Sequence, residues 1–206
     1  MAWMAWGARC GHPPGDARLQ SRMAMVTKTA LTNEELEKLP APEQGGGYEL
    51  DEGEPVYVSP NSLEQARVIY RIYARLNEWA ESTKLGLVAP DTWFELSPGV
   101  VRAPDVAFVP AERLTDIDPK HVLKVAPALV VEVLSLRNTA REISRKIQQY
   151  RDAGVSSIWV VDSDKKEVDV HSSLPLRTLR EADILADQQV LPGFSMPVSQ
   201  IFASIF

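Results

Sequence analysis

The chain has 206 residues, of which 45% are hydrophobic and 24% are charged, and its formal net charge is −6. This length suits one domain with a full hydrophobic core, and no apolar run approaches the roughly 20 residues that span a bilayer. Because the net charge is negative, the molecule as a whole does not attract nucleic acid, and a polyanion would need a local basic patch or a metal ion. The composition favours a soluble globular protein and disfavours a membrane protein.

Cysteine usage and the N-terminal segment set further bounds. Cys10 is the single cysteine, which excludes an intramolecular disulfide and a cysteine-based zinc cluster and fits a reducing cytoplasm. Residues 1–24 carry Gly, Pro and Arg without a continuous apolar core, so we expect a disordered extension and not a signal peptide. Met23 or Met25 is the expected start of translation, and residues 25–206 are expected to form a single domain.

The first predicted elements are a short helix, a hairpin and a long helix. Thr32 and Glu35 have the spacing of a capping box, which predicts a helix that ends near Leu39. The stretch "YELDEGEPVYVS" predicts a hairpin that turns at Glu52-Gly53 and whose second strand begins at Glu54. From residue 61 to about residue 83 the apolar residues recur every three or four positions, which predicts an amphipathic helix.

The second half of the chain is rich in predicted strands. Several short strands, punctuated by prolines, lie between residues 86 and 109, and the best of them begins at Asp105. The run "ALVVEVLS" is typical of a strand that is covered on both faces. A helix over residues 138–153 ends before Gly154, "SSIWVVDSDKKEVDVHSS" predicts two more strands, and a short apolar helix lies in the tail. We therefore predict an α/β fold, with a mixed central β-sheet flanked by α-helices.

Three residues of this pattern could carry chemistry. Asp105 stands at the start of a strand, Glu132 lies inside a buried strand, and Lys146 lies on the helix that follows it. A carboxylate in an apolar strand is costly unless it is paired or binds a cation. Two such carboxylates on neighbouring strands could bind a hard divalent ion such as Mg²⁺, and a nearby lysine could orient or help deprotonate a water or stabilise charge on a phosphate. The set suits phosphodiester hydrolysis.

The lysine does not lie where a compact Glu-x-Lys motif would have it. Glu132 and Leu134 face the same side of the strand, and leucine occupies the position of the expected lysine. On the following helix Lys146 falls on the border of the buried face, so it can reach inward along the sheet. Glu142 lies one turn earlier and could hold the ammonium group or form a surface pair with it.

Several motifs together resemble the Uma-two family of putative restriction endonucleases, which belongs to the PD-(D/E)XK nuclease superfamily. They run in order over about residues 31–206: "YELDEGEPVYVSP", "RAPDVAFV", "VVEVLS", the spacing of Glu142, Lys146 and Tyr150, "GVSSIWVVD" and "LPGFSMPVSQIF". The resemblance implies a restriction-endonuclease-like core, a metal site at Asp105 and Glu132, and a lysine moved from the strand to the helix at Lys146. It also implies an acidic contribution from Glu54.

The chain departs from the family pattern at two places. Family members usually have a histidine near the start of the long helix, where this chain has Leu63, Glu64 and Gln65. They also tend to have Ser-Pro after the catalytic strand, where this chain has Ser135-Leu136. The first difference bears on any histidine-dependent step, and the second is a change of loop sequence.

Each candidate residue also has a purely structural interpretation. Asp105 follows a proline and could cap a turn, and Glu132 could form a structural ion pair with Lys146 or Arg102. Lys146 could extend its stem over the surface, and Glu54 could be a surface residue of a hairpin. The basic residues of the same helix could form a solvated face or contact phosphates. These residues are Arg137, Arg141, Arg145, Lys146 and Arg151.

Two classes of function follow. The first is a Mg²⁺-dependent endonuclease, with Mn²⁺ as an alternative ion, that cleaves nucleic acid, expected to be DNA. Asp105 and Glu132 bind the metal in it, Glu54 assists directly or through water, and Lys146 positions the attacking water. The second is a catalytically silent protein of the same fold that binds DNA or another protein. Because enzymes that cut both strands of a duplex commonly act as symmetric pairs, a homodimer is expected.

Overall fold

The computed structural model describes residues 30–172 and 175–204. The extension predicted for residues 1–24 lies outside the described residues. The chain order is α1, β1, β2, α2, β3 to β6, the 3₁₀ helix η1, β7, α3, β8 to β12 and α4. The helices are α1 (Asn33–Leu36), α2 (Leu63–Thr83), η1 (Ala111–Arg113), α3 (Ala140–Asp152) and α4 (Val198–Ile201).

The strands form sheets of six, four and two members. The six-stranded sheet has the order β10-β9-β8-β7-β6-β3, and only the β7–β8 pair is parallel. The four-stranded sheet has the order β2-β1-β5-β4, and β11 pairs with β12. The bounds are β1 (Gly47–Asp51), β2 (Glu54–Val58), β3 (Gly86–Pro90), β4 (Phe94–Ser97), β5 (Val100–Arg102), β6 (Val106–Pro110), β7 (Leu129–Val133), β8 (Ser157–Asp162), β9 (Glu167–His171), β10 (Arg177–Arg180), β11 (Ile184–Leu185) and β12 (Met196–Pro197).

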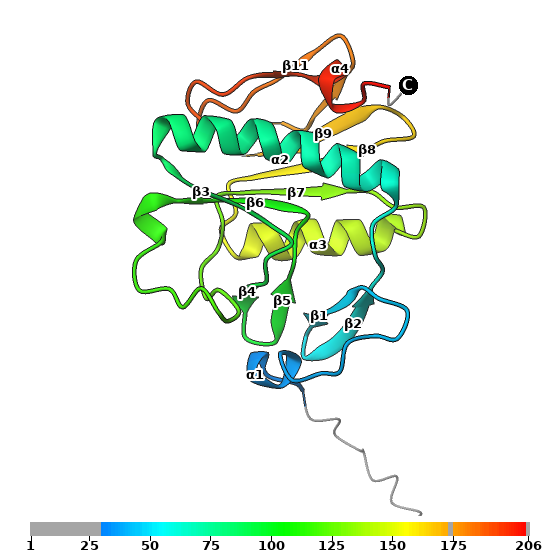
Figure 1. The fold of residues 1–206 in the computed structure, drawn as a ribbon, viewed down its shortest axis with the longest axis vertical. Coiled ribbons are helices and arrows are strands. Elements are labelled where there is room, and N and C mark those ends of the chain that lie inside the picture. The colour runs from blue at the N-terminus through cyan, green and yellow to red at the C-terminus, as the bar shows by residue number, and fades with distance from the viewer. Residues whose placement is uncertain (1–29, 173–174, 205–206) are drawn as a thin grey trace, which may run out of the picture.

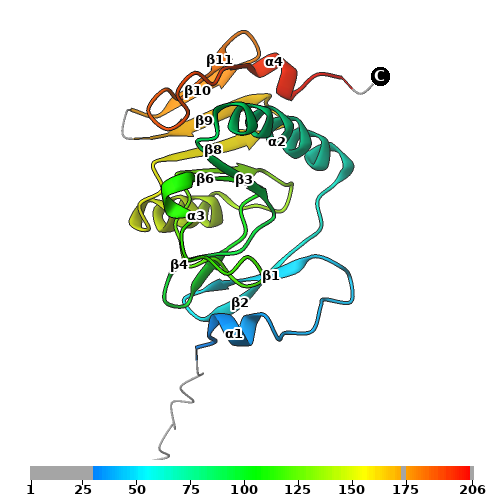
Figure 2. The same cartoon turned by 60° about the vertical axis from the view of Figure 1, so that its left-hand side comes forward.

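The helices divide the molecule into layers. Figures 1 and 2 show α2 on one side of the six-stranded sheet and α3 on the other, with the four-stranded sheet beyond α3 and the C-terminal segment beyond α2. Apolar residues of α2 pack on alternate residues of β6, β7 and β8, among them Val131 and Trp159. On the opposite face, Val130 and Ile158 pack with residues of α3. The predicted α/β class with a mixed, helix-flanked sheet is confirmed.

Local sequence explains most of the element boundaries. Ser62 and Thr139 cap α2 and α3, and each is joined to the residue at N3 in a capping box. The predicted hairpin turn is present, because Glu52 and Gly53 both have a positive φ, which suits a two-residue connection. α1 ends at Leu36 and not near Leu39, since Pro40 disfavours helical geometry in the residue before it.

The sequence did not predict how the strands divide among separate sheets. β4 and β5 join the hairpin strands β1 and β2 in a separate sheet, and β10 to β12 were not predicted at all. These last strands are short, with two to four residues each, and β10 is half exposed. Their sequences therefore lack the apolar alternation that reveals longer strands.

Candidate active site

Glu132 lies one residue before the end of β7 and points toward α3. The strand alternates, so Leu129, Val131 and Val133 pack on the α2 side while Val130 and Glu132 face the other side. Glu132 is 9% exposed, although it is the acidic residue of an otherwise apolar strand. A carboxylate with so little access to water must be stabilised by partners within the protein.

Lys146 and Tyr150 of α3 supply those partners. The Lys146 Nζ lies 3.2 Å from Oε1 and 3.1 Å from Oε2 of Glu132. The Tyr150 hydroxyl donates a hydrogen bond of 2.5 Å to Oε1 of the same carboxylate. Because the two residues are four apart on the helix, they lie on one face and both reach the strand. The predicted inward reach of Lys146 is therefore present.

The surroundings set the protonation states of both partners. Burial alone would lower the pKa of Lys146, but the carboxylates of Glu132 and Glu49 outweigh it and raise this pKa above its ordinary value. Burial, and then the charge of Glu132, raises the pKa of the Tyr150 phenol well above its ordinary value. Lys146 is thus an ammonium group at neutral pH, and Tyr150 is a hydrogen-bond donor.

Asp105 lies immediately before β6, the strand that pairs with the Glu132 strand β7. Its Oδ2 accepts a hydrogen bond of 2.6 Å from the backbone N–H of Val133. Burial, and then the negative charge of Glu132, raises the pKa of Asp105 to about 7. Asp105 thus lies at the same end of β7 as Glu132, and Lys146 lies beside Glu132.

The hairpin places Glu49, which the sequence analysis did not single out, beside Lys146. Glu54 begins β2 and lies opposite Asp51 in the strand register. The hairpin carboxylate that contacts Lys146 is Glu49 of β1, whose Oε1 lies 3.1 Å from Nζ. Sequence reasoning missed Glu49, although "YELD" shows an acid inside a predicted strand, which is the same signal that singled out Glu132.

Arg102 was also misplaced by the sequence interpretation. It was considered as a structural partner for Glu132, but its Nη1 lies 2.9 Å from Oε2 of Glu49. Arg102 is 3% exposed and also contacts Gln149 of α3 and Asp51 of β1. Glu142, expected near Lys146, instead forms the capping box of α3 with Thr139.

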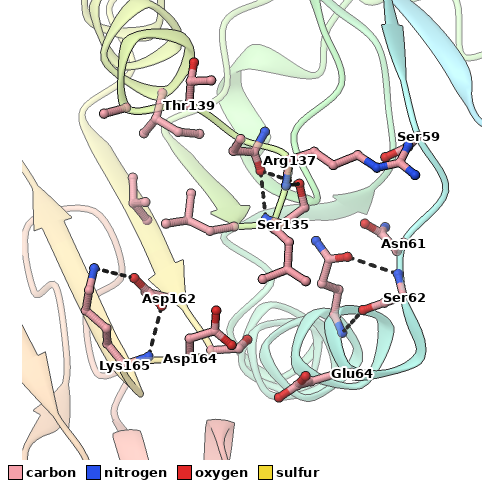
Figure 3. A pocket seen from close by; sticks show the side chains of 18 of the residues that line it. Ser59, Asn61, Ser62, Glu64, Ser135, Arg137, Thr139, Asp162, Asp164 and Lys165 are labelled. Atoms are coloured by element: carbon pink, nitrogen blue, oxygen red, sulfur yellow. Dashed lines mark hydrogen bonds and ion pairs between the residues drawn. The ribbon is translucent and has the colours of Figure 1, made fainter.

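A wide groove lies at the C-terminal end of β7, and Asp105, Glu132, Lys146 and Glu49 are not among the residues that line it. Its volume is about 1420 Å³, and residues 59–65, 134–140 and 162–165 line it. In Figure 3 the loop with Ser135 and Arg137 faces the start of α2 on one side and the turn with Asp162 and Lys165 on the other. The Nε2 of Gln65, at the start of α2, lies 3.4 Å from the carbonyl oxygen of Val133, so the groove borders the strand end that also binds Asp105.

The residues present are chemically suited to a divalent ion. Within residues 30–172 and 175–204 no group of three or more His, Cys, Asp or Glu side chains is arranged to hold a metal. Mg²⁺ is commonly bound by one or two carboxylates together with waters and substrate phosphates. The pair of Asp105 and Glu132 fits that kind of ligation.

No helix in the described part of the chain is long and apolar enough to cross a bilayer.

The fold and the cluster define a restriction-endonuclease-like protein, and comparison with known proteins gives the family. The Uma2 family, described as "Putative restriction endonuclease", matches residues 33–199. The chain belongs to this family, which is the one that the motifs resembled. A search of curated proteins found no match.

A solved structure supports the fold independently. The chain is similar to a crystal structure described as a putative nuclease belonging to DUF820 from Anabaena variabilis. The TM-score is 0.71 at 15% sequence identity, and the match covers 84% of this chain and 98% of that one. At this identity the likeness shows the shared fold.

Proposed function

We propose that the protein is a Mg²⁺- or Mn²⁺-dependent endonuclease that hydrolyses phosphodiester bonds of DNA. One observation carries the proposal: Lys146 lies against the buried carboxylate of Glu132 on β7, and a second carboxylate, Asp105, lies just before the neighbouring strand β6. Membership of the Uma2 family supports a nuclease. The substrate and the metal dependence belong to the proposal.

Asp105 and Glu132 would hold the ion. When bound, a divalent ion neutralises charge on a phosphate and relieves the repulsion between the two carboxylates. The Val133 N–H orients Asp105, and the Tyr150 hydroxyl orients Glu132, so both carboxylates are fixed by donors from β7 and α3. Fixed ligands lower the reorganisation needed when substrate arrives.

Lys146 would position the attacking water. As an ammonium group it donates hydrogen bonds and carries positive charge, so it holds a water or a phosphate oxygen and does not act as a base. Glu54, at the start of β2, is retained in the proposal as an acidic contribution that acts directly or through water. The groove at the C-terminal end of β7, with Arg137 in its wall, is the proposed path for the nucleic acid.

The test is cleavage of supercoiled plasmid DNA with Mg²⁺ or Mn²⁺, compared with EDTA. Asp105→Ala and Lys146→Ala are each expected to lower the rate by about 100-fold or more. Asp118→Ala and Lys120→Ala are the matched controls, because both residues are exposed in a loop, and they should cleave at the wild-type rate. Wild-type rates in both site variants would overturn the assignment.

A metal-binding measurement separates the enzyme from a silent protein of the same fold. Calorimetry should show Mn²⁺ binding to the wild type that is lost in Glu132→Gln. The acidic net charge of −6 favours the silent alternative, and the absence of any Glu132-dependent binding would establish it. We further propose a cytoplasmic homodimer, and a purely monomeric mass in solution would contradict the dimer.

A further inference from the structure

Glu49 is the most completely bound carboxylate of the cluster. It is 1% exposed, and three donors reach it. The Lys146 Nζ lies 3.1 Å and the Ala103 N–H lies 3.0 Å from Oε1, while Arg102 Nη1 lies 2.9 Å from Oε2. A buried carboxylate held by a backbone N–H and a guanidinium group has little freedom to turn.

The two carboxylates that contact Lys146 come from different sheets. Glu132 belongs to β7 of the six-stranded sheet, and Glu49 belongs to β1 of the four-stranded sheet. A lysine side chain has four flexible bonds, and a single partner would leave it several orientations. Contacts from both sheets restrict the ammonium group to the space between them.

Arg102 fixes the position of Glu49 relative to α3. Its Nε and Nη2 lie 2.9 Å and 2.6 Å from Oε1 of Gln149, which is three residues from Lys146 on the same helix. Arg102 therefore holds the carboxylate of Glu49 in a fixed position relative to α3, the helix that carries Lys146. Nothing in this arrangement requires Glu49 to touch a substrate.

We propose that Glu49 is a positioning residue that holds the Lys146 ammonium group beside Glu132. This inference rests on the proposed function in so far as Lys146 serves the cleavage reaction. The competing interpretation is that Glu49 only docks the hairpin on α3 through Arg102. Asp51 distinguishes the two, because it also binds Arg102, together with Gln149 and Arg145, whereas Lys146 pairs with Glu49 and Glu132.

The first experiment measures the position of Lys146 without any assay of activity. The protein is treated with formaldehyde and a borohydride, and methylation of each lysine is followed by mass spectrometry. Lys146 should be protected in the wild type and in Asp51→Asn, whereas Glu49→Gln should expose it to modification at least several times faster. Exposed lysines such as Lys120 serve as internal references. Equal protection of Lys146 in Glu49→Gln and the wild type would overturn the proposal.

The second experiment is a double-mutant cycle in plasmid cleavage. Glu49→Gln alone should lower kcat by about tenfold or more with little change in KM, because a group that aligns the reaction is disturbed. In a Lys146→Met background, Glu49→Gln should cause no further loss, since the residue it positions is gone. Equal losses in both backgrounds, or an equal loss in Asp51→Asn, would show a structural role and contradict the proposal.

A fallback keeps the test decisive if Glu49→Gln does not fold. The pair Glu49→Gln/Arg102→Met removes the guanidinium that would otherwise face the new amide, and Arg102→Met alone is its reference. Failure of the proposed function is distinguishable from failure of this inference. A wild type that cleaves nothing, but whose Lys146 loses protection in Glu49→Gln, would overturn the nuclease and support the positioning.

Discussion

The two faces of the six-stranded sheet use the same strands for different purposes. Under α2, the β7 residues Leu129, Val131 and Val133 join a large cluster of buried apolar residues. Toward α3, the same strand presents Val130 and then Glu132, whose charge is answered by Lys146. One face is built to exclude water, and the other holds charges that a purely stabilising core would not need.

This difference teaches where stability and chemistry are separated in the fold. Buried ion pairs contribute little net stability relative to apolar residues of the same size, but breaking one is costly. On the charged face, a substitution that removes one partner of an ion pair should therefore lower the free energy of unfolding strongly. Replacing both partners by neutral residues should lower it much less. On the apolar face, each lost methylene group lowers the free energy of unfolding. Removing a second apolar side chain does not restore that loss.

The largest expected effect is the loss of Lys146 alone. Lys146→Met leaves Glu132 and Glu49 facing each other without the ammonium group, and we expect a loss of about 4 kcal/mol in the free energy of unfolding. The double variant Lys146→Met/Glu132→Gln removes the charge on both sides and should recover most of that loss. Urea unfolding of the wild type, the single variant and the double variant measures the loss and its recovery. A double variant as unstable as the single one would contradict the proposed difference between the two faces.

A truncated side chain on the apolar face should lower the free energy of unfolding somewhat less than the loss of Lys146, and it should leave the cleavage reaction unchanged. Leu129 is fully buried, and Leu129→Ala should lower the free energy of unfolding by about 3 kcal/mol, since it removes apolar contacts and leaves a cavity. Leu176→Ala is the control, because Leu176 is 56% exposed and does not line the groove, and its unfolding should match the wild type. Cleavage per folded molecule should be unchanged in both, so a specific loss of kcat in Leu129→Ala would contradict the separation of the two faces.

Tyr150 contacts both apolar residues and the charged cluster, and removing its hydroxyl should lower the free energy of unfolding less than either substitution above. Its ring packs with Val130 and Ile158, and its hydroxyl donates to Glu132. Tyr150→Phe keeps the ring and removes a hydrogen bond to a charged group, so we expect a loss of about 2 kcal/mol in urea unfolding. In Glu132→Gln the acceptor is neutral, and the same substitution should then cost less. An equal cost in both backgrounds would show that the hydroxyl acts independently of the charge.

The elements on both faces could be predicted because their signals are local. The spacing of apolar residues identified α2, β7 and α3, and the capping box of Thr32 and Glu35 marked where α1 begins. The inward direction of Lys146 followed from its position relative to Tyr150 on the same helix. These inferences needed only a few consecutive residues.

The other half of the charged cluster could not be predicted, because it depends on contacts between distant segments. Glu49 and Arg102 are 53 residues apart in the chain and meet only when β1 and β5 pair. The hairpin alternates between acids such as Glu49 and apolar residues such as Leu50, but alternation alone does not say which side will face α3. The role expected of Glu54 came from the family resemblance and not from a predicted contact with α3.

The smallest expected effect lies outside both faces, at the exposed pair of His121 and Glu37. The His121 Nδ1 lies 2.8 Å from Oε2 of Glu37, and this hydrogen bond raises the pKa of His121. A raised pKa in the folded state means that the contribution is complete below the unfolded pKa of about 6.5 and is lost as pH rises through the folded pKa. Thermal unfolding of the wild type and His121→Asn should therefore differ slightly at pH 6, and the difference should shrink as the pH rises above about 6.5, with other titrating groups common to both proteins. Because the imidazole is exposed, the difference should stay well below that of Tyr150→Phe. A larger difference would mean that a surface pair stabilises this fold as much as the buried charges do.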